Sequence, residues 1–462
     1  MNIKRYLALL AVVSLMSCMP QALQTERPAT VSPAQAAFRT SVDSPPTGWS
    51  GPVFQLSRDY PKDKPNCDAP WLNRSVNFQD PNPKWDDWAP YVQDIVTYIK
   101  EGQDPNLPDQ TGWNTSVNGE TRWYHVPWMA YDGERGREFA HGLTNELSTA
   151  LPAFRDGGRG SGKHILATKS GDQLKKPPLY ETWSVGMYNS CGGWSIGQAF
   201  SASGLPVTYS KDGKNFARGL PFPDGTVVIK LLNTTADETT VPYMKGSTNW
   251  RANGHKQLGA TEYSTCEREV RTVHLVQVDI AVVDSRSPTR WVYSTLAYDG
   301  NLPNATIWGR LTPLGVQFGN DGRSFPAVPQ ARSKPLYETV LAPVGIPEHY
   351  GCQKRLAGAV DQSNSSCVSC HMGAYAAVPP YLNLQGQTIP AIFNFGGICT
   401  DHNEANAQYF SDYKYPDPYP GRGFNNAIPL DSSLQLAVAF AQYATYVSPQ
   451  ALPQACPDAR GK

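Results

Sequence analysis

A short segment near the C-terminal end of the 462-residue chain, Cys367-Val368-Ser369-Cys370-His371, constrains the fold more than any other feature of the sequence. Two cysteines separated by two residues and followed directly by a histidine form the pattern through which haem c is attached covalently. The two thiols can form thioethers with the two vinyl groups of one porphyrin, and the histidine then offers an imidazole nitrogen to the iron. We therefore predict one covalent haem c, with Cys367 and Cys370 as thioether residues and His371 as the proximal iron ligand.

The same cysteine pair could instead form a disulfide, a thiol redox pair or half of a zinc site. A zinc ribbon needs a second C-x-x-C, and the chain contains none. A thioredoxin-like pair would open a helix after a buried strand, whereas residues 361–366 before the motif (DQSNSS) are polar and turn-like. Haem attachment is therefore the favoured interpretation.

The N-terminus has the pattern of an export signal. A basic start, residues 1–5, precedes an apolar run over residues 6–16 that is too short to span a membrane. Residues 15–18 (LMSC) resemble the bacterial lipobox, and this resemblance implies a lipid anchor on Cys18 after removal of a signal peptide, residues 1–17. The alternative is an ordinary signal peptide cut nearby. By resemblance to known sorting patterns, Met19 in place of Asp implies a periplasmic protein anchored in the outer membrane.

The charge balance excludes several partner classes. The chain has 40 basic and 40 acidic side chains, so it offers no basic surface for nucleic acid. Residues 157–164 (GGRGSGKH) nearly match a phosphate-binding P-loop, but His164 replaces the magnesium-binding hydroxyl. We therefore predict no nucleic-acid and no nucleotide partner, and expect redox partner proteins and a membrane instead.

Cysteine usage suits an oxidising compartment. Of nine cysteines, Cys18, Cys367 and Cys370 have predicted roles, which leaves six. An even remainder predicts up to three disulfides, for which fifteen connectivities are possible. These six residues are Cys67, Cys191, Cys266, Cys352, Cys399 and Cys456.

The remaining patterns predict an α+β fold. A flexible tether is predicted over residues 18–50, which are rich in Pro, Ala, Ser and Thr. A β-rich domain with an antiparallel sheet or sandwich is predicted over residues 51–345. Residues 346–462 are predicted to form a small helical, cytochrome c-like haem region. Apolar spacing predicts a helix over 85–101 and a final amphipathic helix over 430–443 capped by Asp431 or Ser432. Strands are predicted over 226–232, 270–283 and 290–298, with a hairpin formed by 183–188 and 194–200.

The motif together with the final helix resembles c-type cytochromes over roughly residues 350–448. Beyond this region, the chain resembles a family of bacterial cytochrome c-containing proteins, which implies a β-rich partner domain and names no substrate. The segments that carry this wider resemblance are residues 126–129 (VPWM), 136–139 (GREF), 225–228 (GTVV), 277–282 (QVDIAV) and 434–438 (LQLAV).

The sixth iron ligand departs from the pattern of small cytochromes, where a Met tens of residues after the motif usually supplies it. Here the last methionine, Met372, is adjacent to His371 and cannot reach the other side of the haem. The position is therefore filled from elsewhere or is open, and His–Met, bis-His and open sites differ in potential and reactivity. The candidate ligands are Met129, Met187 and His402, with His125 and His141 as further possibilities.

The sequence as a whole predicts an exported mono-haem c-type cytochrome that transfers electrons in the periplasm at the outer membrane. It contains no pairing of a nucleophile with a base, so we assign no catalytic residue. A haem enzyme, such as a peroxidase or another oxidoreductase, and a haem-based ligand sensor are the alternatives.

Overall fold

The computed structural model describes residues 46–50, 54, 56–104, 113, 116–129, 131–132, 136–137, 143–145, 181–239, 241–256, 267–304, 306–322, 336–346, 350–361, 365–376, 411–416 and 427–447. The predicted export signal, Cys18 and most of the tether lie outside these residues, as do His141, His164 and His402. Among the described helices, none is long and apolar enough to cross a membrane.

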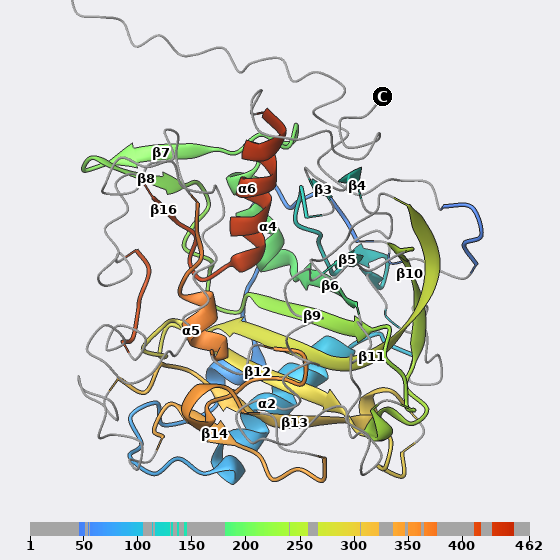
Figure 1. The fold of residues 1–462 in the computed structure, drawn as a ribbon. Helices are drawn as coiled ribbons and strands as arrows, with labels where there is room; N and C mark the ends of the chain where they lie inside the picture. Colours follow the sequence, from blue (N-terminus) through green and yellow to red (C-terminus); the bar gives the residue numbers. More distant parts are fainter. Residues whose placement is uncertain are drawn as a thin grey trace, which may run out of the picture.

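An eight-stranded sheet in which each paired neighbour is antiparallel forms the centre of the described structure (Figure 1). Seven strands follow one another in the order β14-β13-β12-β11-β9-β6-β5, and β10 pairs with β11 beside this path. The predicted strands over 226–232, 270–283 and 290–298 are confirmed as β9, β11 and β12. The bounds are β5 Leu143–Asn145, β6 Thr182–Tyr188, β9 Val227–Thr234, β10 Asn249–His255, β11 Arg268–Val283, β12 Trp291–Tyr298, β13 Leu311–Gln317 and β14 Thr339–Leu341.

Short two-stranded pairs and single turns of 3-10 helix complete the described backbone. The pairs are β1 Ser116–Val117 with β2 Glu120–Thr121, β3 Tyr131–Asp132 with β4 Gly136–Arg137, β7 Thr208–Lys211 with β8 Lys214–Ala217, and β15 Tyr375–Ala376 with β16 Ile428–Pro429. The 3-10 turns are η1 Pro70–Asn73, η3 Pro242–Met244, η4 Trp308–Arg310 and η6 Cys352–Lys354.

The helix α2 (Trp85–Lys100) covers one face of the sheet, as the apolar spacing predicted. Its first turn carries Asp86 and Asp87, whose negative charges interact favourably with the positive end of the helix dipole. Trp88 stacks on Phe318 with ring centroids 4.5 Å apart, and the buried side of α2 joins the apolar side chains that this sheet face presents. Burial of these aromatic and aliphatic side chains is the main stabilising contribution on this side.

Three helices lie on the opposite face of the sheet: α4 (Ser190–Ala199), α5 (Cys367–His371) and α6 (Leu434–Val447). Figure 1 shows α5 directly against the sheet and α6 beyond it, next to α4. Val368 of α5, Phe440 of α6 and Ile196 of α4 belong to one buried cluster with sheet residues such as Tyr293. The pairing of β15 with β16 ties the chain after α5 to the chain before α6. The described residues thus form one large sheet with helices on both faces, and no second packed sheet is seen among them.

The hairpin predicted for residues 183–200 is wrong, because its second half is the helix α4. The Asn189 side chain caps this helix by accepting a hydrogen bond from the Gly192 amide. Glycines let α4 pack closely: a Cβ on Gly193 would lie 2.8 Å from the Tyr124 ring, and one on Gly197 would lie 2.5 Å from Tyr60. Tertiary packing therefore overrides the weak helix propensity of this glycine-rich segment.

The start of the final helix also differs from the prediction. Asp431 and Ser432 adopt left-handed backbone angles, with φ of 45° and 62°, and do not cap α6. Ser433 is the cap instead, since its hydroxyl accepts a hydrogen bond from the Leu436 amide at 3.2 Å. Asp431 and Ser432 are thereby available for contacts outside the helix.

A disulfide joins Cys67 to Cys191 at the start of α4, which confirms a bridge between two of the six predicted cysteines. Cys352 is also disulfide-bonded. Cys367 and Cys370 are in no disulfide.

We expect loss of the Cys67–Cys191 bridge, in a variant with Cys67→Ala and Cys191→Ala, to lower the free energy of unfolding by roughly 2–5 kcal/mol, because the bridge closes a long loop of the unfolded chain. Its ends are 124 residues apart in the sequence. Urea unfolding followed by tryptophan fluorescence measures the change. Equal midpoints for the variant and the parent protein would contradict a stabilising role.

Candidate functional site

The helix α5 brings Cys367, Cys370 and His371 together. Residues three and four positions apart lie on the same side of a helix, so both thiols and the imidazole belong to one side of α5. The Ser366 hydroxyl caps the helix by accepting a hydrogen bond from the Ser369 amide. The arrangement of donors that the spacing predicted is therefore present as one local unit.

Cys367 faces the sheet over β12. Its sulfur lies 3.5 Å from the Leu356 carbonyl oxygen, and the thiol also interacts with Thr295. Burial raises the pKa of the Cys367 thiol well above its usual value, and the nearby Asp361 and Asp279 carboxyl groups raise it further. The thiol is therefore held in its protonated form at neutral pH.

Asp279 and Asp361 form a partly buried carboxyl pair beside Cys367. The Gln277 amide nitrogen donates to both, at 2.9 Å and 3.2 Å, and the Thr295 hydroxyl donates to Asp279 at 2.9 Å. Burial, followed by the Asp361 charge, raises the pKa of Asp279 well above its usual value. This side of the site thus holds a proton at a pH where an exposed aspartate would not.

A backbone carbonyl orients His371. Its ring atom Nδ1 lies 2.9 Å from the Ser432 carbonyl oxygen, and its ring packs against Tyr293 with centroids 4.8 Å apart. A carbonyl can only accept a hydrogen bond, so Nδ1 carries the proton and Nε2 carries the lone pair in the neutral ring. A hydrogen bond of this type is the usual partner of a metal-binding histidine, because it fixes the tautomer and the ring plane.

Asp431, next to Ser432, connects this carbonyl to the sheet. Its carboxylate accepts from the Arg290 guanidinium at 2.8 Å, from the Phe222 amide at 2.8 Å and from the Trp291 indole at 3.3 Å. The carboxylate is almost fully buried, so these donors must replace its lost hydration. Asp431 thereby fixes the left-handed turn from which Ser432 reaches His371.

A second buried network holds the rear of α5. Asn320 donates from Nδ2 to the Met372 sulfur at 2.6 Å and accepts at Oδ1 from the Ser369 hydroxyl at 2.6 Å. Arg355, which is completely buried, pairs with Asp321 at 3.2 Å and donates to the Asn320 carbonyl. Met372 is thus part of the network behind α5.

Glu338 and Asp412 form the outer part of this network. A hydrogen bond joins the two carboxyl groups, and the Asp321 amide donates to Glu338 at 2.6 Å. Burial, the Asp412 charge and the Asp321 charge raise the pKa of Glu338 to about 8. Burial also raises the pKa of Asp412. The pair therefore shares a proton at neutral pH.

The structure separates Met187 from α5. Successive residues of a strand point to opposite faces, and Gly186 faces α6, since a Cβ on it would collide with Gln435. Met187 accordingly packs in the cluster on the α2 side of the sheet, away from the motif. Met187 is therefore not brought together with the motif, because the sheet lies between them.

Met129 and His125, two other candidates for the sixth ligand, are among the described residues. Met129 is partly buried on the α5 side, against the cluster that contains Val368 and Met372. The neighbouring Trp128 ring packs on Tyr443 of α6 at 5.3 Å. His125 is buried, and its carbonyl accepts from the Tyr60 hydroxyl. His141 and His402 lie outside the described residues.

The described residues fit a covalent haem by the chemistry of their donors. Two thiols outside disulfides and one imidazole with a fixed tautomer share one side of α5, in a chain that forms disulfides elsewhere. The sequence alone did not identify Ser432, Asp431 or Tyr293 as parts of the site. Ser432 is 61 residues from His371 in the chain, so no local pattern links the two.

We expect Asp431→Asn to lower the free energy of unfolding by about 3 kcal/mol, because the buried Arg290 guanidinium loses its counter-charge. Chemical unfolding monitored by circular dichroism tests this. Asp94→Asn is the matched control, since the Arg74–Asp94 pair is partly exposed and its loss costs about 1 kcal/mol or less. Equal effects of the two changes would contradict a central role for Asp431.

The raised pKa of Glu338 predicts that the free energy of unfolding depends on pH. Because its pKa is raised on folding, the folded state binds the proton more tightly, and the resulting stabilisation is complete below the unfolded pKa of 4.5 and lost as the pH rises to about 8. Between these values the free energy of unfolding should fall by at most about 1.4 kcal/mol per pH unit. Urea titrations at pH 5, 6, 7 and 8 compare the parent protein with Glu338→Gln, which should show a flatter profile. Parallel profiles would show that Glu338 is not the responsible group.

Comparison of the chain with family models, with curated proteins and with solved structures finds no match. The resemblance to c-type cytochromes thus depends on the motif and the segments named above.

Proposed function

We propose that the protein is an exported mono-haem c-type cytochrome that transfers electrons. The observation that carries this proposal is the single side of α5 on which Cys367, Cys370 and His371 lie, with Nδ1 of His371 held 2.9 Å from the Ser432 carbonyl. The Cys67–Cys191 disulfide supports an oxidising compartment outside the cytoplasm. Within that proposal, a lipid on Cys18 anchors the chain at the outer membrane, and redox proteins are its partners.

The chain's own residues would act as follows. Cys367 and Cys370 would hold the porphyrin through two thioethers, and His371 would offer Nε2 to the iron. The bound haem c supplies one-electron chemistry, the exchange between ferric and ferrous iron. Ser432 keeps the imidazole plane fixed, and the apolar cluster around Val368 and Phe440 would limit access of water to His371. Ligation, burial and nearby charge then set the potential.

The carboxyl pair Asp279–Asp361 favours a second candidate, a haem oxidoreductase that consumes protons. These groups lie beside Cys367, and burial raises the pKa of Asp279, so they could deliver a proton near the ring. Electron transfer is the better supported function, because the Ser432 carbonyl and the Tyr293 ring hold the His371 imidazole in one orientation, as suits a carrier. A ligand sensor is distinguished from both by its response to CO.

Absorption spectra of the protein matured with haem test the proposal. We expect a c-type reduced α-band and no shift with CO. The double change Cys367→Ala and Cys370→Ala should abolish covalent haem on a denaturing gel, and His371→Ala should remove the low-spin spectrum. Met372→Leu is the control that keeps both, because Met372 only supports α5 from behind. A high-spin spectrum with a strong CO shift would replace the carrier by an enzyme or sensor.

Single substitutions identify the sixth ligand. Met187→Leu should leave the spectrum unchanged, because Met187 lies on the far face of the sheet. We expect Met129→Leu to abolish a weak sulfur-to-iron band near the red end of the oxidised spectrum, since Met129 lies on the α5 side. Loss of low-spin character in His402→Ala instead would assign the ligand to His402.

A further inference from the structure

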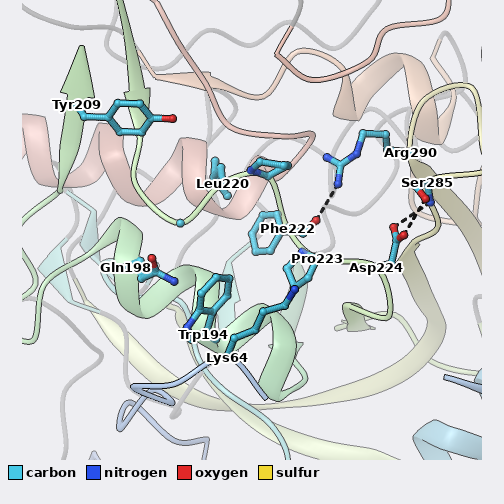
Figure 2. A pocket seen from close by; sticks show the side chains of 12 residues that line it. Lys64, Trp194, Gln198, Tyr209, Leu220, Phe222, Pro223, Asp224, Ser285 and Arg290 are labelled. Atoms are coloured by element: carbon cyan, nitrogen blue, oxygen red, sulfur yellow. Dashed lines mark hydrogen bonds between the residues drawn. The ribbon is translucent and has the colours of Figure 1, made fainter. Parts of the chain in front are cut away.

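A pocket of about 480 Å³ opens between α4, the β7–β8 hairpin and the segment before β9. Figure 2 shows Trp194 of α4 at the pocket and Tyr209 of β7 at its edge; Phe222 also lines the pocket, and its side chain is buried behind that lining. Lys64 extends along Trp194, with its ammonium 6.0 Å from the ring centroid. None of these residues belongs to the motif, and the proposed electron transfer does not use the pocket.

The lining of the pocket suits a flat aromatic ligand that carries negative charge. Tyr209 is the one large apolar side chain exposed on the described surface, at 44% of its area, and it stacks on Phe216 with centroids 5.5 Å apart. Aromatic faces such as Trp194 and Tyr209 favour stacking with another ring. Lys64 adds a cation at the rim that can meet an anionic group of the ligand; Arg290 is paired with Asp431, and the Asp224 carboxylate accepts from Ser285. A cavity of this volume holds a small molecule rather than a protein surface.

A chain of ring contacts links this pocket to the predicted iron ligand. Phe222 in the pocket wall meets Trp291 at 5.6 Å, Trp291 stacks on Tyr293 at 6.3 Å, and Tyr293 meets His371 at 4.8 Å, all between ring centroids. Trp291 is buried and hydrogen-bonded to Asp431, so water does not separate the rings of this series. Electron tunnelling weakens steeply with distance, and packed rings give it a short path.

We propose that this pocket binds a hydroquinone-type electron donor and passes its electrons to the iron through Trp291 and Tyr293. The inference rests on the proposed haem. One hydroquinone reduces two equivalents of ferric protein, releases two protons to water and leaves as the quinone, so atoms and electrons balance. Lys64 stabilises the deprotonated hydroxyl or another anionic group of the donor.

Binding is tested first without haem. Calorimetry with benzenesulfonate and with 2,5-dihydroxybenzenesulfonate on the variant with Cys367→Ala and Cys370→Ala reports on the pocket alone. Trp194→Ala should weaken binding roughly tenfold through loss of ring stacking. Trp85→Ala, a partly buried tryptophan of α2 across the sheet, is the matched control and should leave affinity unchanged. No binding, or equal binding in Trp194→Ala, would overturn the pocket assignment.

Electron transfer is tested next on the haem-loaded protein by stopped-flow reduction with 2,5-dihydroxybenzenesulfonate. The rate should saturate at the affinity found by calorimetry. Trp194→Ala should raise the half-saturating concentration, whereas Trp291→Phe should lower the maximal rate. A rate that rises linearly with donor, or is unaffected by both changes, would overturn the inference while the haem assignment stands. Absence of covalent haem would refute the proposed function and, with it, the electron path, but the calorimetric result would still decide the binding site.

Discussion

The buried carboxylate of Asp431 joins three parts of the chain that are far apart in sequence. Its bonds to Arg290, Trp291 and Phe222 fix the hairpin end of β12 and the wall of the pocket in Figure 2. The same residue holds the left-handed turn that aims the Ser432 carbonyl at His371. An ion pair this deeply buried contributes little net stability, since desolvation offsets most of the attraction. The Asp431 contacts instead fix geometry, because they hold Asp431 and Ser432 at positive φ, a backbone conformation that is otherwise unfavourable.

A helix of five residues cannot hold its own position, because helix nucleation is unfavourable and so short a helix adds few stabilising hydrogen bonds. α5 depends on its surroundings instead. Ser366 caps its start, Asn320 binds Met372 and Ser369 at its rear, and Ser432 binds His371 at its end. In the proposed function this rigid backing keeps the imidazole in one place through both oxidation states. Little rearrangement then accompanies each electron, which suits a carrier more than a centre that must admit a substrate.

The sequence predicted those elements that are determined by residue patterns within a single short segment. The apolar spacing of α2 and the long alternation of β11 were sufficient, and the spacing of the motif was enough to group both thiols and the imidazole. The prediction failed for α4, because its stability comes from close approach of glycines to aromatic rings and from the bridge at Cys191. The residues that hold α5 and His371 in place could not be predicted from the sequence either. Arg290 and Asp431 are separated by 141 residues, and only the folded sheet brings them together. The side of the sheet on which Met187 lies likewise became clear only from the strand register.

The proposed cytochrome function depends most on the attachment of one haem to α5. Peptide mapping by mass spectrometry of the protein exported from a host that matures c-type haem tests this directly. We expect a single peptide that contains Cys367 and Cys370 and carries the mass of one haem, while the peptides joined through Cys67 and Cys191 remain disulfide-linked. A motif peptide at its unmodified mass, or one closed by a disulfide between Cys367 and Cys370, would contradict it.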